Sequence, residues 1–321
     1  MPRRAAPLPS TLGDVFSVAT ALSLNVPAGR LRRRDLHSPF RGVRQIETMR
    51  GRAYDPGAEY GETRDRVLAL MRAYAFVMPP HAFFAGATAA VAWGAPVPHP
   101  CDTLCVGVHA PARALTARGI RGVKIAPTLA PLRRLAELRL TSPATSWAML
   151  AGKAARRTLI AVGDAFVRVP RDSRGRPVPG EQLATVSQLE AAARAPYRRR
   201  RLELLDALAE VRVCSASPLE TDMRLDLTAC GLPEPELDAE IRDRTGRLLG
   251  IGDLAYRAQR VVIEVEGDHH RTDRRQWQRD IQKQRAYVAE GWDLVRVTSA
   301  DVRGRNRSAV AAVRAALARH T

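Results

Sequence analysis

The chain has 321 residues, of which 45% are hydrophobic, and this length and composition predict a folded protein of two or three domains. Its formal net charge of +18 favours a polyanionic partner such as nucleic acid, although a GC-rich genome produces such an excess of arginine over lysine without selection for binding. No stretch approaches the ~20 continuous apolar residues of a membrane helix and the N-terminus lacks a signal peptide's apolar segment, so we expect a cytoplasmic protein with no membrane partner.

Residues 1–50 are predicted to form a small, mostly helical DNA-binding region. Thr11 can cap a helix that runs to about Leu22, and a second short helix over residues 27–34 follows a turn. The Phe-Arg-Gly-Val segment at 40–43 then suits a β-wing, so the order is typical of a winged helix-turn-helix. The basic run of the second helix either contacts DNA phosphates or is a solvated face. It comprises Arg30, Arg32, Arg33 and Arg34.

Residues 63–168 are predicted to form an α/β middle region in which no group of side chains suggests chemistry. The pattern predicts helices over 64–76 and 84–94, strands over 104–109 and 122–125, and helices that begin near Ser142 and Arg157. Residues 169–215 are expected to be a linker with a helix. The cysteines lack the spacing of a zinc site or a disulfide scaffold, and are expected to be reduced. They are Cys101, Cys105, Cys214 and Cys230.

Residues 216–321 have the pattern helix, three strands, helix, strand. Ser217 begins the first helix, and Gly231 ends it. Because a strand, a helix and a strand require a right-handed crossover, the last strand should lie parallel to its partner. The second helix, over 272–289, is expected to turn Trp277, Ile281 and Val288 inward. The predicted strands are 236–242, 247–256, 261–266 and 294–297.

The strand register predicts an acidic patch. A four-residue turn over 257–260 places Tyr256 opposite Val261, and counting inward then places Asp253 opposite Glu264. Because side chains alternate along a strand, Glu266 shares the face of these two acids, while the other face is apolar. We therefore expect a sheet with one apolar face and one acidic patch.

A divalent cation explains this patch, because like charges on adjacent strands destabilise a fold unless something compensates them. Asp253 and Glu264 would hold Mg²⁺ or Mn²⁺, with the Val265 carbonyl as a further ligand. The ion would polarise a phosphoryl oxygen and lower the pKa of its bound water, which attacks phosphorus. The patch therefore predicts hydrolysis of phosphodiester bonds in DNA.

The C-terminal segment resembles the very-short-patch-repair endonuclease-like group of the PD-(D/E)XK nuclease superfamily. The similar segments are Ser-Pro-Leu-Glu at 217–220, Gly-Asp-Leu at 252–254, Val-Ile-Glu-Val-Glu-Gly-Asp-His-His at 262–270, Asp280, Arg285, Gly-Trp at 291–292 and Val-Arg-Val at 295–297. The resemblance implies a restriction-endonuclease-like αβββαβ mixed sheet flanked by helices. It assigns Asp253 and Glu264 to the metal, Glu220 as the helix carboxylate that completes the site, and His270 as a proton-transfer group.

One position departs from the superfamily pattern. A lysine often lies two residues after the second acid, and this chain has Glu266 there. A carboxylate does not supply the positive charge of a lysine, so Glu266 would bind a second ion or orient water. Lys283 and Arg285 on the following helix are candidates for the missing charge.

Residues 1–168 resemble the AbiEi-type antitoxin and regulator family of bacteria. The similar stretches are the N-terminal helix-turn-helix with its Arg-Gly-Val wing, Ala89-Ala90 through Trp93-Gly94 and Pro96, and Thr-Ser-Pro-Ala at 141–144. This resemblance implies a DNA-binding module and a cognate toxin protein as a possible partner.

Each site residue also has a structural explanation. Glu220 has the capping-box spacing from Ser217, and Asp253 suits an exposed bulge. Glu264 and Glu266 suit the solvent side of an edge strand, and His270 suits an exposed turn. The basic run past the acids either contacts phosphates or is a solvated face. It comprises Arg271, Arg274, Arg275 and Arg279.

Two functions from different classes follow for this mixed α/β chain. The first is a Mg²⁺-dependent DNA endonuclease coupled to an N-terminal DNA-binding module. The second is a non-cleaving regulator, similar to a type IV antitoxin, that uses the nuclease fold as a binding surface. The missing lysine favours the second, whereas the joint presence of Glu220, Asp253, Glu264 and His270 favours the first.

Overall fold

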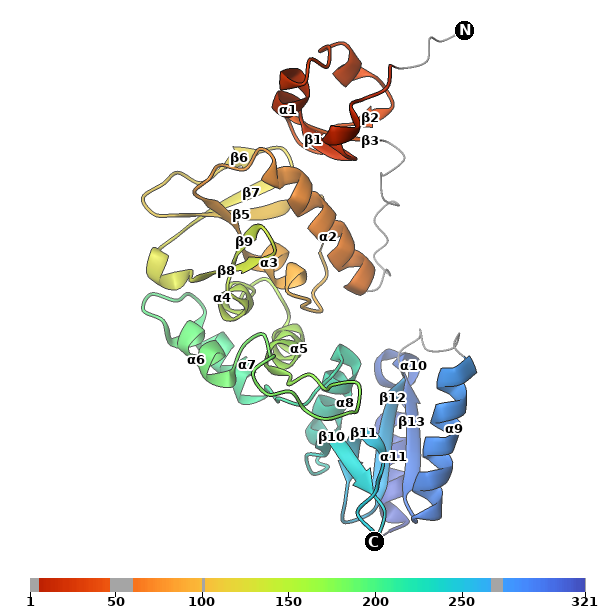
Figure 1. Ribbon diagram of the computed structural model, residues 1–321. Helices are drawn as coiled ribbons and strands as arrows, with labels where there is room; N and C mark the ends of the chain where they lie inside the picture. The colour runs from red at the N-terminus through yellow and green to blue at the C-terminus, as the bar shows by residue number, and fades with distance from the viewer. Residues whose placement is uncertain (1–5, 47–59, 100–101, 267–273, 321) are drawn as a thin grey trace. The chain divides into compact units, whose positions relative to one another are not determined.

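The computed structural model describes residues 6–46, 60–99, 102–266 and 274–320, with side chains of the last range from 281 onward (Figure 1). Within these ranges the chain is mixed α/β, with eleven α-helices and three β-sheets. None of the described helices has the length and apolarity needed to cross a membrane. Two compact units form, the first from 1–154 and 187–204 and the second from 155–186 and 205–321.

The N-terminal region of the first unit contains a three-stranded sheet and is less helical than predicted. Strand β1 (Val15–Ser17) precedes α1 (Val18–Ser23), and Ser17 caps that helix because its Oγ accepts from the Thr20 N–H at 2.9 Å. The predicted start at Thr11 is wrong, since the extended segment around the buried Phe16 pairs with β3 (Val43–Ile46).

The second predicted helix of this region is also wrong in extent. Only one 3-10 turn, Arg30–Arg32, forms within 27–34. A short antiparallel pairing between β2 (Leu36–His37) and β3 follows, and Gly42 with φ 84° lies in the connection. The sheet order is β1-β3-β2.

The rest of the first unit is built on a six-stranded sheet of order β6-β7-β5-β4-β9-β8. The predicted helix over 84–94 begins two residues late, because Phe84 ends a buried strand that pairs with β5. The strands are β4 (Ala82–Phe84), β5 (Leu104–His109), β6 (Thr116–Ala117), β7 (Ile120–Ile125), β8 (Leu132–Leu135) and β9 (Leu138–Thr141). The helices are α2 (Tyr60–Ala75), α3 (Gly86–Ala92), α4 (Pro143–Ala148) and α6 (Val186–Arg194), with α7 (Arg201–Ala209) following.

The second unit has the predicted order of helix, three strands, helix and strand. Its sheet order is β10-β11-β12-β13, with antiparallel pairs up to β12 and a parallel pair between β12 and β13, which confirms the predicted direction of the last strand. The strands are β10 (Glu236–Arg242), β11 (Leu248–Tyr256), β12 (Val261–Glu266) and β13 (Asp293–Thr298). The helices are α5 (Arg156–Val167), α8 (Pro218–Ala229), α9 (Arg274–Ala289), α10 (Ser299–Arg303) and α11 (Ala309–Ala318). Helix α5, predicted within the middle region, therefore belongs to this unit.

Both faces of this sheet are packed against helices, so the predicted acidic patch shares its face with apolar residues. Leu254 and Ile263 pack against α8, α10 and α11, as the alternation predicts. On the other face, Ala255 and Val262 pack against Tyr287 of α9. The acids therefore lie at the end of a packed face, and the low polarity around them is set by the helix that covers it.

Helix α9 is rotated relative to the prediction. Val288 is 59% exposed, whereas its neighbour Tyr287 is fully buried. One residue is 100° of helix rotation, so the face that contacts the sheet carries Lys283 and Tyr287, spaced four apart. The side chain of Trp277 lies outside the described residues.

Candidate functional site

The register that brings the two strand acids together is the predicted one. Tyr256 pairs with Val261, Ala255 with Val262 and Leu254 with Ile263. At the next position the Asp253 side chain itself bridges the strands, because the Val265 N–H donates to Asp253 Oδ2 at 2.7 Å. Asp253 is therefore fixed beside Glu264 on an internal strand, and the exposed-bulge and edge-strand explanations are wrong for these two acids.

Lys283 supplies a positive charge beside Asp253 and Glu264, and we call these three side chains the centre. Its Nζ lies 2.7 Å from Glu264 Oε1 and donates to the Ile251 carbonyl oxygen at 2.6 Å. The contact with Glu264 is an ion pair between two partly buried side chains. Lys283, one of the two predicted candidates, thus lies at the acids.

Arg285, the other candidate for the missing positive charge, and Glu266 have different surroundings. Arg285 lines a shallow surface hollow with Ile281 and Val288. The side chain of Glu266, two residues after Glu264, is 42% exposed and lies 3.3 Å from Arg296 Nη1. The second acid of the Glu-Val-Glu sequence is therefore an exposed, paired carboxylate at the end of β12.

Glu220 is both a helix cap and a buried acid. Ser217 Oγ accepts from the Glu220 N–H at 3.2 Å, so Ser217 caps the helix. Glu220 Oε2 accepts from the Ala216 N–H at 2.7 Å rather than from the Ser217 N–H that a capping box uses. The residue is nevertheless only 6% exposed. Burial raises the pKa of Glu220 to about 8, and the charge of Asp253 contributes to this rise. The Ala216 N–H accounts for one oxygen of the Glu220 carboxylate. The effect of the Asp253 charge on the pKa of Glu220 relates this carboxyl to the acid on β11.

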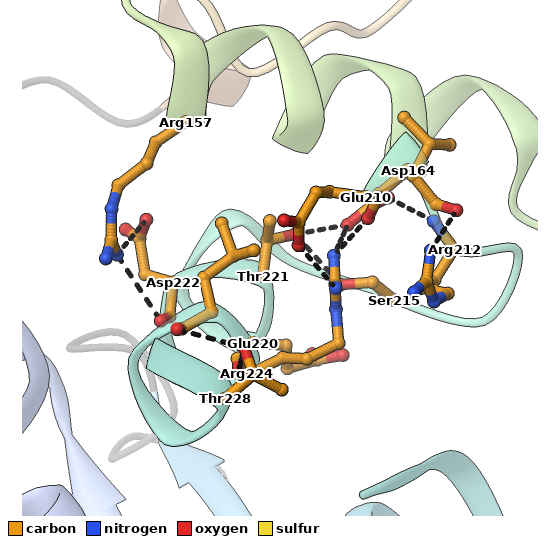
Figure 2. A network of polar contacts seen from close by, with 12 residues as sticks. Arg157, Asp164, Glu210, Arg212, Ser215, Glu220, Thr221, Asp222, Arg224 and Thr228 are labelled. Atoms are coloured by element: carbon orange, nitrogen blue, oxygen red, sulfur yellow. Dashed lines mark hydrogen bonds and ion pairs between the residues drawn. The ribbon is translucent and has the colours of Figure 1, made fainter. Parts of the chain in front are cut away.

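A buried polar network holds the N-terminal half of α8, which carries Glu220 (Figure 2). Asp164 of α5 accepts from Thr221 Oγ1 at 2.8 Å and from the Arg212 N–H at 2.7 Å, and its Oδ2 lies 3.3 Å from Arg224 Nη2. Asp164 and Arg224 are 1% and 0% exposed. Helix α5 thus fixes the helix that presents Glu220.

The three acids share an environment that disfavours negative charge. Burial raises the pKa of Glu264 to about 7 despite the opposing effect of Lys283. Burial also raises the pKa of Asp253, although the Val265 N–H and Lys283 oppose this rise. Carboxylates in such surroundings bind protons or cations more readily than exposed ones do.

Within the described ranges, no three His, Cys, Asp or Glu side chains converge as ligands of one metal ion. His270 and Arg271 lie outside the described residues, as do the side chains of Arg274, Arg275 and Arg279 on the first turns of α9. These calls therefore remain predictions. In the N-terminal region Arg32, Arg33 and Arg34 are exposed, whereas Arg30 pairs with Asp35 at 2.7 Å. Arg30 is thus used within the fold, and both explanations remain for the other three.

Tyr287 is a residue of the centre that the sequence analysis missed. Its side chain is fully buried and its hydroxyl has no hydrogen-bond partner among the described residues. Burial raises its pKa, with further contributions from Glu264 and Asp253. A Cβ on Gly250 would lie 2.6 Å from Tyr287 Oη and 2.9 Å from Lys283 Cε, so the glycine lets both side chains approach the strand. In the sequence, the four-residue spacing of Lys283 and Tyr287 indicates that they share one face of the helix.

In comparison with known proteins, no family model, no curated protein and no solved structure matches the chain. Functional inference therefore depends on the site itself.

The raised pKa of Glu220 predicts a pH-dependent stability. Between about pH 4.5 and 8 the folded protein retains a proton on this carboxyl that the unfolded chain has lost, so the metal-free protein loses stability as the pH rises through this window. We expect the Tm to fall by several degrees from pH 5 to pH 8.5, and by less in Glu220→Gln. Thermal melts in EDTA measure this, with Glu181→Gln, at an exposed carboxylate of the same unit, as the control. An unchanged pH dependence in Glu220→Gln would contradict the burial argument.

Proposed function

We propose that the second unit is a Mg²⁺- or Mn²⁺-dependent endonuclease that hydrolyses phosphodiester bonds in DNA, and that the N-terminal region of the chain helps to bind the DNA. The observation that carries this proposal is the placement of Asp253, Glu264 and Lys283 together by the Val265–Asp253 hydrogen bond and the Lys283–Glu264 ion pair. The element order αβββαβ supports it, because this is the order that the similarity to PD-(D/E)XK nucleases implies.

The residues present fit a divalent cation. Asp253 and Glu264 offer hard carboxylate oxygens, and Glu220 is a third acid in electrostatic contact with Asp253. The buried carboxyls hold protons more tightly than usual, as expected of groups whose negative charge needs compensation. When bound, the metal would supply Lewis-acid activation of a phosphoryl oxygen and of a water.

The side chains of the centre have separate tasks. Glu264 would hold the cation together with Asp253, and its ion pair with Lys283 orients its carboxylate. Lys283 supplies a fixed positive charge from α9, where it can stabilise the charge that develops on a phosphate. Asp253 is oriented by the backbone of β12, because the hydrogen bond from the Val265 N–H favours one conformation of its side chain.

Plasmid nicking tests the proposal. Purified full-length protein is incubated with supercoiled plasmid and Mg²⁺ or Mn²⁺, and we expect metal-dependent conversion to the open circle that is lost in Asp253→Asn. Glu181→Gln, at an exposed carboxylate of the same unit, is the control for removal of one carboxylate and should retain nicking. Equal behaviour of wild type and Asp253→Asn would overturn the assignment.

The runner-up function is a DNA-binding regulator that does not cleave, in line with the resemblance of 1–168 to AbiEi-type antitoxins, with a toxin protein as its partner. One observation favours it: Lys283 already compensates Glu264, and the Ala216 N–H already donates to Glu220, so the centre is partly satisfied without a metal. This protein would bind DNA with a steep salt dependence but leave plasmids intact. Salt-dependent binding alone does not distinguish the two functions, because phosphate contacts produce it in both.

A further inference from the structure

A loop in the first unit presents an aromatic ring and several cations to solvent. It joins α6, which ends at Arg194, to α7, which begins at Arg201, and we call residues 195–202 the Tyr197 loop. Tyr197 is 96% exposed and Leu202 is 82% exposed. A tyrosine this exposed contributes almost nothing to packing within the chain. Its ring is instead available on both faces.

The backbone of the Tyr197 loop is held in a defined shape. Tyr197 and Arg200 have φ values of 62° and 59°, the left-handed region that residues with a Cβ rarely adopt. Arg198 anchors the loop, because its Nε donates to the Ala192 carbonyl oxygen at 3.0 Å and its Nη2 donates to that of Leu129 at 2.9 Å. The fold therefore holds Tyr197 and Arg200 in an unfavourable backbone conformation, and these two residues carry the ring and one of the cations.

The cations of the loop are not compensated. Arg199, Arg200 and Arg201 are exposed and form no ion pair with any residue that the structure describes. Elsewhere in the same unit exposed arginines do pair, as Arg194 does with Glu190 at 2.7 Å. The acid that follows the loop, Glu203, accepts from the Gly152 N–H at 2.8 Å. The loop is therefore a concentrated positive charge beside an open aromatic face.

We propose that the Tyr197 loop binds single-stranded nucleic acid, with an unpaired base stacked on Tyr197 and the flanking phosphates on Arg199 and Arg201. Stacking on an aromatic side chain together with arginine contacts to the backbone is the physical basis of single-strand binding that tolerates many sequences. The net charge of +18 favours a nucleic acid as the partner. A membrane surface is disfavoured because one tyrosine and one leucine offer too little apolar area for stable insertion. This site lies in the first unit and needs no metal.

Fluorescence anisotropy with a labelled oligothymidylate in EDTA tests the site. We expect Tyr197→Ala to weaken binding about ten-fold and Tyr197→Phe, which keeps the ring, to bind as the wild type does. A duplex of the same length should be bound equally by wild type and Tyr197→Ala, since its bases are already stacked. Arg199→Ala/Arg201→Ala should lower the salt dependence of single-strand binding. Arg113→Ala/Arg118→Ala removes equal charge from exposed positions of the same unit and should have a smaller effect.

Three results would overturn the proposal. The first is wild-type affinity for the oligonucleotide in Tyr197→Ala, and the second is an equal loss of affinity in the loop and control arginine pairs. The third is that Tyr197→Ala loses binding to phosphatidylserine vesicles while it keeps oligonucleotide binding. Circular dichroism of each variant establishes that the fold is kept. Because the assay contains no metal and the variants leave the acids of the second unit intact, failure of plasmid nicking and failure of this site are separate outcomes.

Discussion

Replacing Lys283 with methionine is expected to slow metal-dependent nicking by about 100-fold or more, the usual effect of removing one preorganised charge from a phosphate-transfer site. Methionine keeps the apolar stem that lies beside Tyr287 and removes the ammonium 2.7 Å from Glu264 Oε1. The pKa of Glu264 should rise further, because Lys283 is the largest influence that lowers it. Initial rates with saturating Mg²⁺ measure the loss.

Two further variants show whether the charge itself is responsible. Arg285→Met removes a cation from the same helix but from its outer side, and should leave the rate unchanged. Combining Glu266→Lys with Lys283→Met returns a cation from the strand instead of the helix, two residues after Glu264 and on the same face of β12. This double variant should recover part of the activity. Wild-type nicking by Lys283→Met, with none by Asp253→Asn, would rule out a role for the ammonium.

The sequence predicts the second unit well because its signals are local. The strands at 236–242 and 261–266 have the predicted bounds, and the turn at 257–260 sets the register that unites Asp253 and Glu264. The N-terminal region was predicted less well. There the short segment around Phe16 pairs with a strand that begins at Val43, a contact across the sequence that no local propensity reports.

The sequence analysis named the three acids of the site, but it did not identify the helix face that lies against them. Lys283 was one of two candidates, because helical spacing alone did not reveal which face of α9 meets the sheet. The apolar residues Ile281 and Val288 suggested one face, whereas the packed face carries Lys283 and Tyr287 beneath Gly250. Close approach to a glycine outweighs the hydrophobic pattern here, since any side chain at position 250 would occupy the space of both.

Replacing Arg224 with methionine is expected to lower the unfolding free energy of the second unit by ~3–5 kcal/mol, the range for breaking one partner of a buried ion pair. Asp164 would keep its bonds from Thr221 and Arg212 but lose the guanidinium 3.3 Å away, in surroundings where burial already raises its pKa. Native-state hydrogen exchange followed by mass spectrometry over α8 measures the change in the full-length protein.

An ion pair on the surface of the same unit shows how much of this loss of unfolding free energy is due to burial. Arg156 and Asp206 also pair within the second unit, at 2.5 Å, but are 44% and 62% exposed, so Arg156→Met should cost only ~0–1 kcal/mol. Combining Arg224→Met with Asp164→Asn should cost less than the sum of the single changes, because no buried charge then remains alone. If Arg224→Met costs no more than Arg156→Met, the network in Figure 2 does not hold α8, and the position of Glu220 must depend on its cap to Ser217 and Ala216 instead.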